Sequence, residues 1–428
     1  MIFVTLHGSC LSVLSCTVRP KEVWNGFHHR KFYPGKKKSV HFTTRVSVYK
    51  ALTKKTVKTV DVAVVGAGLA GAYTGFCLAQ KGVDTIVFDN SMYPKNPDYV
   101  TLSQSEMYDR FLNKNYYVKK RIPAPEVISP RGKKFPSHGG RDVTMINRVE
   151  LSRNILEQAM AEGCGVIKEK VLAVRQENGG WILGTKNGIL HCRILIGADG
   201  VHSIVRKTVL DEHRKENLLF GAGFILGGTT IPKGFLKFLP NGELLKVCEC
   251  DAGLNAGIFG PLETAYGRRR RLEALLKEQF GSLAVYSPWT SLLPAASFSH
   301  YFQKPCSGKN WILTGSAAGH VHPLSGEGAE FALASAELAS QAIKCGDPRV
   351  FDSLWRDSYG EKLLSAVDFK KHIYSPVISD TLFFAAARSS TLASIISSYI
   401  SPDSVLDKEA KWKIKDSFRI LAELAGAK

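Results

Sequence analysis

Residues 59–90, TVDVAVVGAGLAGAYTGFCLAQKGVDTIVFDN, carry the strongest indication of the fold. It opens with an apolar run at 62–65 that has the length and β-branched composition of a buried parallel strand. Three glycines follow at the spacing G-x-G-x-x-G: Gly66, Gly68 and Gly71. A small-residue helix is expected at 72–80 and a second strand at 84–88. Strand, glycine turn, helix and strand together predict a dinucleotide-binding βαβ unit.

Each glycine of this unit has its own task. Gly66 permits the tight turn out of the strand, Gly68 lets a pyrophosphate approach the backbone, and Gly71 lets the helix pack closely. The helix start offers free N–H groups and a positive dipole to phosphates. Asp89 follows Gly71 by 18 residues, near the place of a ribose-binding acid, where a carboxylate repels a 2′-phosphate. The unit therefore predicts FAD or NAD rather than NADP, and a glycine turn without a ligand is the alternative.

Two later segments have features of a cofactor site. Residues 194–206, ILIGADGVHSIVR, end a strand in a turn where Asp199 can accept hydrogen bonds from loop N–H groups; an Asp-Gly turn without ligand contact is the alternative. Residues 311–339, WILTGSAAGHVHPLSGEGAEFALASAELA, lead from a strand into a small-residue helix. The bare start of that helix suits the edge of a flavin, where reduction places negative charge. His320 and His322 are the candidate acid or base groups there, and local hydrogen bonding is the alternative.

Basic charge is concentrated at the N-terminus. Residues 1–59 contain twelve Lys or Arg and one acid, Glu22, a net charge of +11, so the other 369 residues contribute +8 of the total +19. This acid-poor, hydroxyl-containing leader is typical of an organellar transit peptide, with a plastid ahead of a mitochondrion. A disordered basic tail for nucleic acid or lipid is the alternative. The chain has no run of about 18 uncharged apolar residues, so no transmembrane helix is predicted.

Nine cysteines are scattered along the chain without a C-x-x-C pair and without the Cys/His spacing of a zinc site. We therefore predict a reducing compartment and no metal site. Cys248 and Cys250 are two residues apart and are expected on one face of a strand, where plain packing is favoured over a metal or redox role.

The three segments, in this order, resemble FAD-dependent oxidoreductases with a glutathione-reductase-type flavin domain, in particular geranylgeranyl reductases and aromatic-hydroxylase monooxygenases. Residues 147–151, NRVEL, resemble the helix start of the reductases, and residues 354–356, LWR, resemble their helical tail. Residues 315–328, GSAAGHVHPLSGEG, are similar to the pattern G-D-A-A-G-x-x-x-P-x-x-G-E-G, with Ser316 in place of the Asp. A Pro-Cys-Gly-Gly segment of those reductases is replaced by SMYPKNPDYV at 91–100.

The resemblance implies an α/β fold: a glutathione-reductase-type FAD-binding Rossmann domain with an inserted antiparallel-sheet substrate domain and a helical C-terminal tail. The expected parts are a disordered transit peptide at 1–55, a discontinuous FAD-binding domain at 58–205 and 306–345, a sheet-based substrate domain at 206–305, and a helical region at 346–428. The resemblance also implies the residues around FAD: Gly66, Gly68, Ala70, Gly71, Asp89, Arg148, Val171 by its backbone, Asp199, Ser316, Gly326, Gly328 and Ala329.

The function implied is that of an FAD-dependent reductase acting on a hydrophobic, isoprenoid-like substrate, with NADPH or reduced ferredoxin as electron donor. No nucleic-acid partner is expected, and the C-terminal helices are compatible with peripheral membrane contact. An NAD(P)H-dependent flavin monooxygenase is one alternative. A non-catalytic FAD-binding accessory protein is another, for which the loss of the family Asp at Ser316 is the marker. The sequence makes no prediction of oligomeric state.

Overall fold

The structure is a computed structural model of the chain. It describes residues 58–90, 99–103, 120–136, 142–228, 230–239, 241–282 and 284–400. All of these lie within one compact unit, residues 49–428. The predicted transit peptide, 1–55, and the last part of the predicted helical tail, 401–428, lie outside the described residues.

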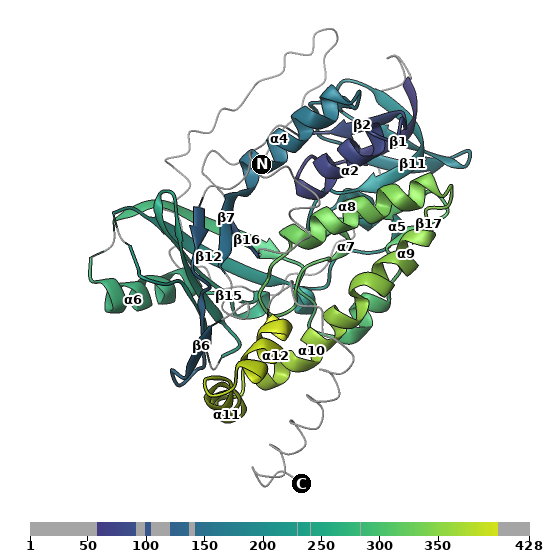
Figure 1. The fold of residues 1–428 in the computed structure, drawn as a ribbon. Coiled ribbons are helices and arrows are strands. Elements are labelled where there is room, and N and C mark those ends of the chain that lie inside the picture. Colours follow the sequence, from purple (N-terminus) through teal and green to yellow (C-terminus); the bar gives the residue numbers. More distant parts are fainter. Residues whose placement is uncertain are drawn as a thin grey trace, which may run out of the picture. The chain divides into compact units, whose positions relative to one another are not determined.

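The described residues form three sheets and a set of helices (Figure 1). The strands are β1 (Lys58–Val65), β2 (Thr85–Phe88), β3 (Tyr99–Ser103), β4 (Lys120–Ile122), β5 (Glu126–Ile128), β6 (Lys134–Pro136), β7 (Val143–Asn147), β8 (Gly165–Ile167), β9 (Ala173–Glu177), β10 (Gly180–Gly184), β11 (Ile189–Gly197), β12 (Leu219–Leu226), β13 (Phe235–Phe238), β14 (Leu244–Cys250), β15 (Gly253–Pro261), β16 (Val285–Leu293), β17 (Ser307–Gly308) and β18 (Trp311–Leu313). The α-helices are α2 (Leu69–Ala79), α4 (Arg148–Ala161), α5 (Ile204–Val209), α6 (Arg268–Phe280), α7 (Gly315–Ala318), α8 (Ala329–Lys344), α9 (Val350–Trp355), α10 (Glu361–Ile373), α11 (Pro376–Ala386) and α12 (Ser390–Ile400). Short 3-10 turns span Lys215–Asn217, Leu262–Thr264 and Ser299–Gln303, and a π-helical turn spans Arg356–Gly360.

The first sheet has eight strands in the order β17-β18-β11-β1-β2-β8, with β10 and β9 added beside β11. Strand β1 runs parallel to both β2 and β11. Along β1, Val62 and Val64 belong to the hydrophobic cluster on one face, and Ala63 and Val65 to the cluster on the other. Both faces of the strand are therefore buried, as the continuous apolar run predicts.

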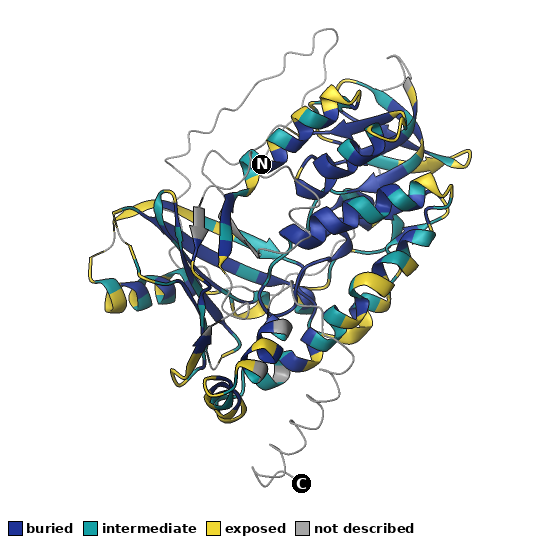
Figure 2. Cartoon of the chain, viewed as in Figure 1, coloured by how far each residue is buried: buried dark blue, intermediate teal, exposed yellow. Residues whose placement is uncertain are grey.

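Two layers cover this sheet. Helices α2, α4 and α8 lie together over one face, and the first half of α8 is buried (Figures 1 and 2). The cluster on the opposite face is built by β9, β10 and α5. The sheet is thus the middle layer, and the carboxyl ends of its parallel strands are left for the turns that follow β1, β11 and β18.

The segment 166–176 contributes to two strands of the first sheet. β8 joins the parallel sheet beside β2, whereas β9 joins the antiparallel meander. Between them the chain turns, because the Glu169 N–H bonds to the Ile167 carbonyl at 2.9 Å and the Glu169 carboxylate accepts from Asn187. Val171, which the resemblance implied contacts FAD by its backbone, lies in this connection and is buried.

The second sheet has seven strands in the order β16-β12-β15-β14-β13-β5-β6 and is antiparallel except where β13 pairs with β5. β5 and β6 pair into this sheet although they fall inside the segment 58–205, which was predicted as FAD-binding domain. The chain returns to the first sheet through β17 and β18. The predicted domain boundaries stay a prediction. Cys248 and Cys250 are both buried on β14, as expected for packing.

Side chains alternate between the two faces of the second sheet, as the pleat requires. Leu254, Ala256 and Ile258 of β15 pack with Leu272 and Leu276 of α6. Helices α10, α11 and α12 pack on the β5–β6–β13 end of the sheet, where Phe383 meets Phe135 edge to face. No helix in the described part of the chain combines the length and apolar composition needed to cross a bilayer.

Candidate functional site

The three segments singled out in the sequence meet at the carboxyl end of the first sheet. A Cβ on Gly71 would lie 1.8 Å from the Gly66 carbonyl oxygen, so α2 starts in direct contact with the turn after β1. A Cβ on Gly66, where φ is +105°, would lie 2.5 Å from the Ala198 carbonyl after β11. A Cβ on Gly315 would lie 2.9 Å from the Ala70 Cβ. The backbone contacts are possible only because glycines occupy these positions.

Gly68 differs from its neighbours because its missing side chain faces open space. No atom lies within 4 Å of a Cβ placed there, and φ is −68°. Gly68 is the N-cap of α2, no side chain caps the helix, and the first backbone bond runs from Ala72 to Gly68 at 2.9 Å. The first N–H groups of α2 are therefore not used by the helix.

A second helix start has the same construction. Gly328 is the N-cap of α8, no side chain caps it, and Ala332 bonds back to Gly328 at 2.9 Å. Gly68 and Gly328 both line one cavity of about 450 Å³. Two bare helix N-termini therefore present N–H groups and positive dipole ends to the same space.

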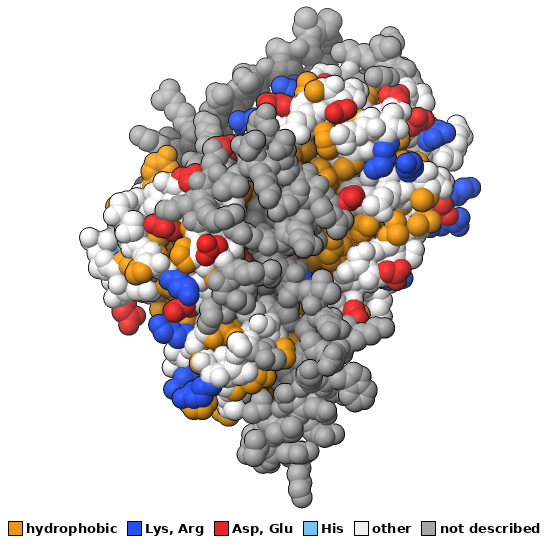
Figure 3. Space-filling model, in the orientation of Figure 1, with side chains coloured by type: hydrophobic (Ala, Val, Ile, Leu, Met, Phe, Trp, Pro, Cys, Tyr) orange, Lys and Arg blue, Asp and Glu red, His pale blue; other side chains and the backbone are white. Residues whose placement is uncertain are grey.

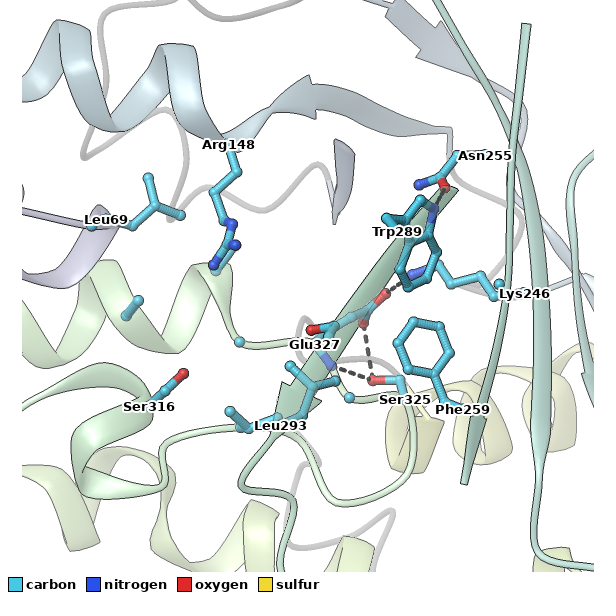
Figure 4. A pocket seen from close by; sticks show the side chains of 18 of the residues that line it. Leu69, Arg148, Lys246, Asn255, Phe259, Trp289, Leu293, Ser316, Ser325 and Glu327 are labelled. Carbon is cyan, nitrogen blue, oxygen red and sulfur yellow. Dashed lines mark hydrogen bonds and ion pairs between the residues drawn. The ribbon is translucent and has the colours of Figure 1, made fainter. Parts of the chain in front are cut away.

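The far wall of this cavity is the second sheet. Asn255, Gly257 and Phe259 alternate along β15 and line it, and Trp289 of β16 lies beside them (Figure 4). The Trp289 indole N–H donates to the Asn255 side-chain oxygen at 2.9 Å, and the Trp289 and Phe259 ring centroids are 5.7 Å apart. A Cβ on Gly257 would lie 2.4 Å from the indole, so glycine is needed to seat it. The wall is aromatic, and its one indole N–H is satisfied.

An ion pair joins this wall to the loop before α8. Lys246 Nζ of β14 lies 2.9 Å from Glu327 Oε1, and the two side chains are only 17% and 13% exposed. Burial lowers the pKa of the Lys246 ammonium, but the Glu327 carboxylate raises it and the net direction is upward. Ser325 donates to the other Glu327 oxygen at 3.2 Å. Figure 4 shows Glu327 between the aromatic wall and the side chains of Arg148 and Ser316, with Lys246 reaching it from the side of the wall.

Comparisons with known proteins agree with this geometry. No protein-family model matches the chain. It is 26% identical over 347 residues to the menaquinone reductase of Mycobacterium tuberculosis, covering 70% of this chain and 80% of that protein. It is 26% identical over 361 residues to the digeranylgeranylglycerophospholipid reductase of Methanospirillum hungatei, covering 75% and 87%. The structure of a geranylgeranyl bacteriochlorophyll reductase-like protein from Thermoplasma acidophilum superposes with a TM-score of 0.69 at 17% identity, covering 84% of this chain and all of that one.

The chain is therefore similar to proteins named as reductases of menaquinone and of geranylgeranyl lipids. Its α/β fold is that of FAD-binding flavoproteins. The residues present fit the pyrophosphate of FAD at Gly68, where the space in front of the backbone is open and a side chain would occupy it.

The structure brings more than half of the predicted site residues together. These line the cavity: Gly68, Ala70, Arg148, Ser316, Gly326, Gly328 and Ala329. Gly66 and Gly71 lie behind them and shape the turn. Asp89 follows β2 at the same end of the sheet, buried, with its N–H bonded to Ile167. Val171 is buried in the cluster on the β9–β10 side of the sheet.

Asp199 serves the turn after β11 and does not line the cavity. Its carboxylate accepts hydrogen bonds from the Ile204 N–H at 2.7 Å, the Val205 N–H at 3.4 Å and the Ser203 hydroxyl. Burial raises the pKa of Asp199, while these hydrogen bonds act in the opposite direction. Asp199 thus fixes the turn, as predicted from the sequence, and its neighbours Ala198 and Gly200 reach the cavity instead.

The prediction that His320 or His322 acts as an acid or base beside the flavin is wrong. Both rings are buried away from the cavity lining. His320 stacks on Trp355 with centroids 3.5 Å apart, and His322 Nδ1 accepts from the Ser325 N–H at 3.3 Å. Burial lowers the pKa of His320 far below its usual value and that of His322 to about 3. Both imidazoles are neutral near pH 7.

Sequence reasoning missed the sheet side of the site. Lys246, Asn255, Phe259 and Trp289 come from three strands, and none belongs to a motif. The sequence indicated them only through alternation along each strand. Alternation shows which residues share one face of a strand, but not what that face packs against. Glu327 was visible between two motif glycines, but its partner Lys246 is 81 residues away.

Proposed function

We propose that the chain is an FAD-dependent reductase that acts on a hydrophobic, isoprenoid-like substrate. The proposal rests on one observation: a single cavity joins two bare helix starts, at Gly68 and Gly328, to an aromatic wall on the second sheet. The names of the related proteins, which mention menaquinone and geranylgeranyl groups, support the isoprenoid class.

The first sheet would hold the cofactor. The N–H groups at the start of α2 would bind the pyrophosphate in front of Gly68, and Asp89 would bind the adenosine ribose. The N–H groups at the start of α8, at Gly328 and Ala329, would face the flavin ring, and Arg148 would lie beside the cofactor. When bound, FAD supplies the electron and hydride transfer.

The second sheet would hold the substrate. We propose that residues 206–305, together with β5 and β6, form the substrate layer. Trp289 and Phe259 offer apolar ring surface and exclude water from the reacting groups. The Lys246–Glu327 pair holds the loop before α8 against this layer and places the Lys246 ammonium at the cavity wall. A positive charge there stabilises negative charge that develops in the cavity during reduction.

We propose NADPH or reduced ferredoxin as the electron donor and a plastid as the compartment. The location is supported by the basic, acid-poor composition of residues 1–59. NADPH and ferredoxin are equal candidates for the donor, and the experiment below separates them.

Anaerobic reduction of the purified flavoprotein tests the proposal. The flavin is first reduced with NADPH or with reduced ferredoxin, and an isoprenoid quinone or a geranylgeranylated lipid is then added without oxygen. The proposal predicts reoxidation of the flavin and a product two hydrogens heavier by mass spectrometry. Reoxidation that requires oxygen and yields a hydroxylated product would establish the monooxygenase alternative. A flavin that no donor reduces would support the accessory-protein alternative.

A further inference from the structure

Helix α11 has an apolar face that points away from the protein. Its inner face packs into the cluster with β5, β6 and β13 through Leu382 and Phe383. On its outer face Val377 is 61% exposed and Phe384 47% exposed, and Ile378 is exposed between the same turns. Val377 and Phe384 are seven residues apart, so they lie on one face of the helix and form a stripe along it, and Ile378 lies beside this stripe. A surface helix normally places charged residues on such a face.

Basic side chains surround this stripe. The Arg388 guanidinium lies 3.5 Å from the Phe384 ring centroid, and the Lys133 ammonium from the β5–β6 turn lies 5.9 Å from it. Figure 3 shows blue and orange side chains together over the β6 and α11 end of the protein. Two further cations are offset by acids: Arg131 lies 3.7 Å from Asp380, and Lys134 lies 3.2 Å from Glu126. The patch therefore combines exposed apolar groups with a net positive rim.

We propose that this patch, formed by α11 and the β5–β6 turn, docks the protein on the surface of an anionic lipid bilayer. An apolar stripe edged by Lys and Arg is the arrangement that places side chains among acyl chains and cations among lipid phosphates. The cations already lie over Phe384, so insertion of that ring would bring them to headgroup level. The inference adds a partner to the proposed function but does not depend on it, because docking is measured without turnover.

Vesicle sedimentation of the full chain tests the proposal. A double variant that carries both Val377→Asp and Phe384→Asp, called the Asp variant, is compared with the unchanged protein. Binding to phosphatidylglycerol vesicles and to phosphatidylcholine vesicles is measured for each. All proteins retain residues 1–59, so the basic leader contributes equally to each. We expect at least a tenfold loss of binding to phosphatidylglycerol, because two apolar anchors become acids. Tyr266→Asp is the matched control, since Tyr266 is 95% exposed near the start of α6, and it should bind as before.

A second double variant tests the attraction between the basic side chains and anionic lipid. Lys133→Gln with Arg388→Gln should weaken binding to phosphatidylglycerol by roughly fivefold per cation and should reduce its salt dependence. Bound flavin and the unfolding midpoint are measured for every variant, and wild-type values show that the fold is kept. Equal binding of the Asp variant and the unchanged protein would overturn the proposal. So would a lipid-free dimer that the Asp variant breaks, since a second copy would then be the occupant.

Discussion

Replacing Gly68 with Val separates cofactor binding from folding. The structure offers the new side chain open space and a backbone conformation that any residue adopts, with φ −68° and ψ −174°. The free energy of unfolding should fall by only about 1 kcal/mol, because Val is a poorer N-cap residue than Gly. The same side chain would, however, fill the space in front of the first N–H groups of α2. Two charge-assisted hydrogen bonds to phosphate are worth about 1.5–3 kcal/mol each, so their loss predicts a roughly 10²–10⁴-fold weaker FAD affinity.

Two measurements on the same preparation check this prediction. Titration of the cofactor-free protein with FAD, followed by flavin fluorescence, gives the dissociation constant, and urea unfolding gives the free energy of unfolding. Gly188→Val is the matched control, because Gly188 also has open space at its Cβ position but lies in the β10–β11 turn. It should keep wild-type affinity. Wild-type affinity in Gly68→Val would mean that the phosphates bind elsewhere and not at the start of α2.

Three further predictions concern the loop between β18 and α8. Ser316→Ala should weaken FAD retention by about 1 kcal/mol, the worth of one hydrogen bond, measured by the same titration; a loss of 100-fold would show that the hydroxyl has a larger role. Burial lowers the pKa of His322 in the folded protein to about 3, whereas the unfolded imidazole takes up a proton near pH 6.5. The free energy of unfolding is therefore at its full value above pH 6.5 and falls as the pH drops toward 3. Urea unfolding should show that the free energy of unfolding falls by about 2 kcal/mol between pH 6.5 and pH 5, and that His322→Gln lacks this fall. The same dependence of the free energy on pH in His322→Gln and in the unchanged protein would contradict this. Glu327→Gln should destabilise the protein by about 1–3 kcal/mol because it leaves Lys246 buried without its counter-charge, whereas Lys246→Met with Glu327→Met should recover much of the loss; additive effects would show that the pair is not coupled.

The cofactor side of the site could be predicted from the sequence because its information is local. The turn after β1 needs glycine at Gly66, where φ is +105°, and at Gly71, where a Cβ would lie 1.8 Å from the Gly66 carbonyl oxygen, whatever the rest of the chain does. The helix starts at Gly68 and Gly328 likewise follow from short motifs. The convergence of the three segments required the parallel pairing of β1 with β11 and of β11 with β18, which buried apolar runs of this kind favour.

The substrate side could not be predicted because its information is not local. β5 and β6 join a sheet whose other strands begin more than 80 residues later, and no pattern in 126–136 indicates that partner. The prediction for His320 and His322 was wrong for a related reason. A loop between two motifs suggested exposure, but the packing of His320 on Trp355 is set by α9, beyond the motif.

The most direct test of the central claim is the flavin content of the purified chain. We predict a yellow protein that releases one FAD per chain on denaturation, identified by mass spectrometry, and that rebinds added FAD in a one-to-one ratio. A chain that folds but neither releases flavin nor binds added FAD would contradict the assignment of the Gly68 and Gly328 helix starts as one cofactor site.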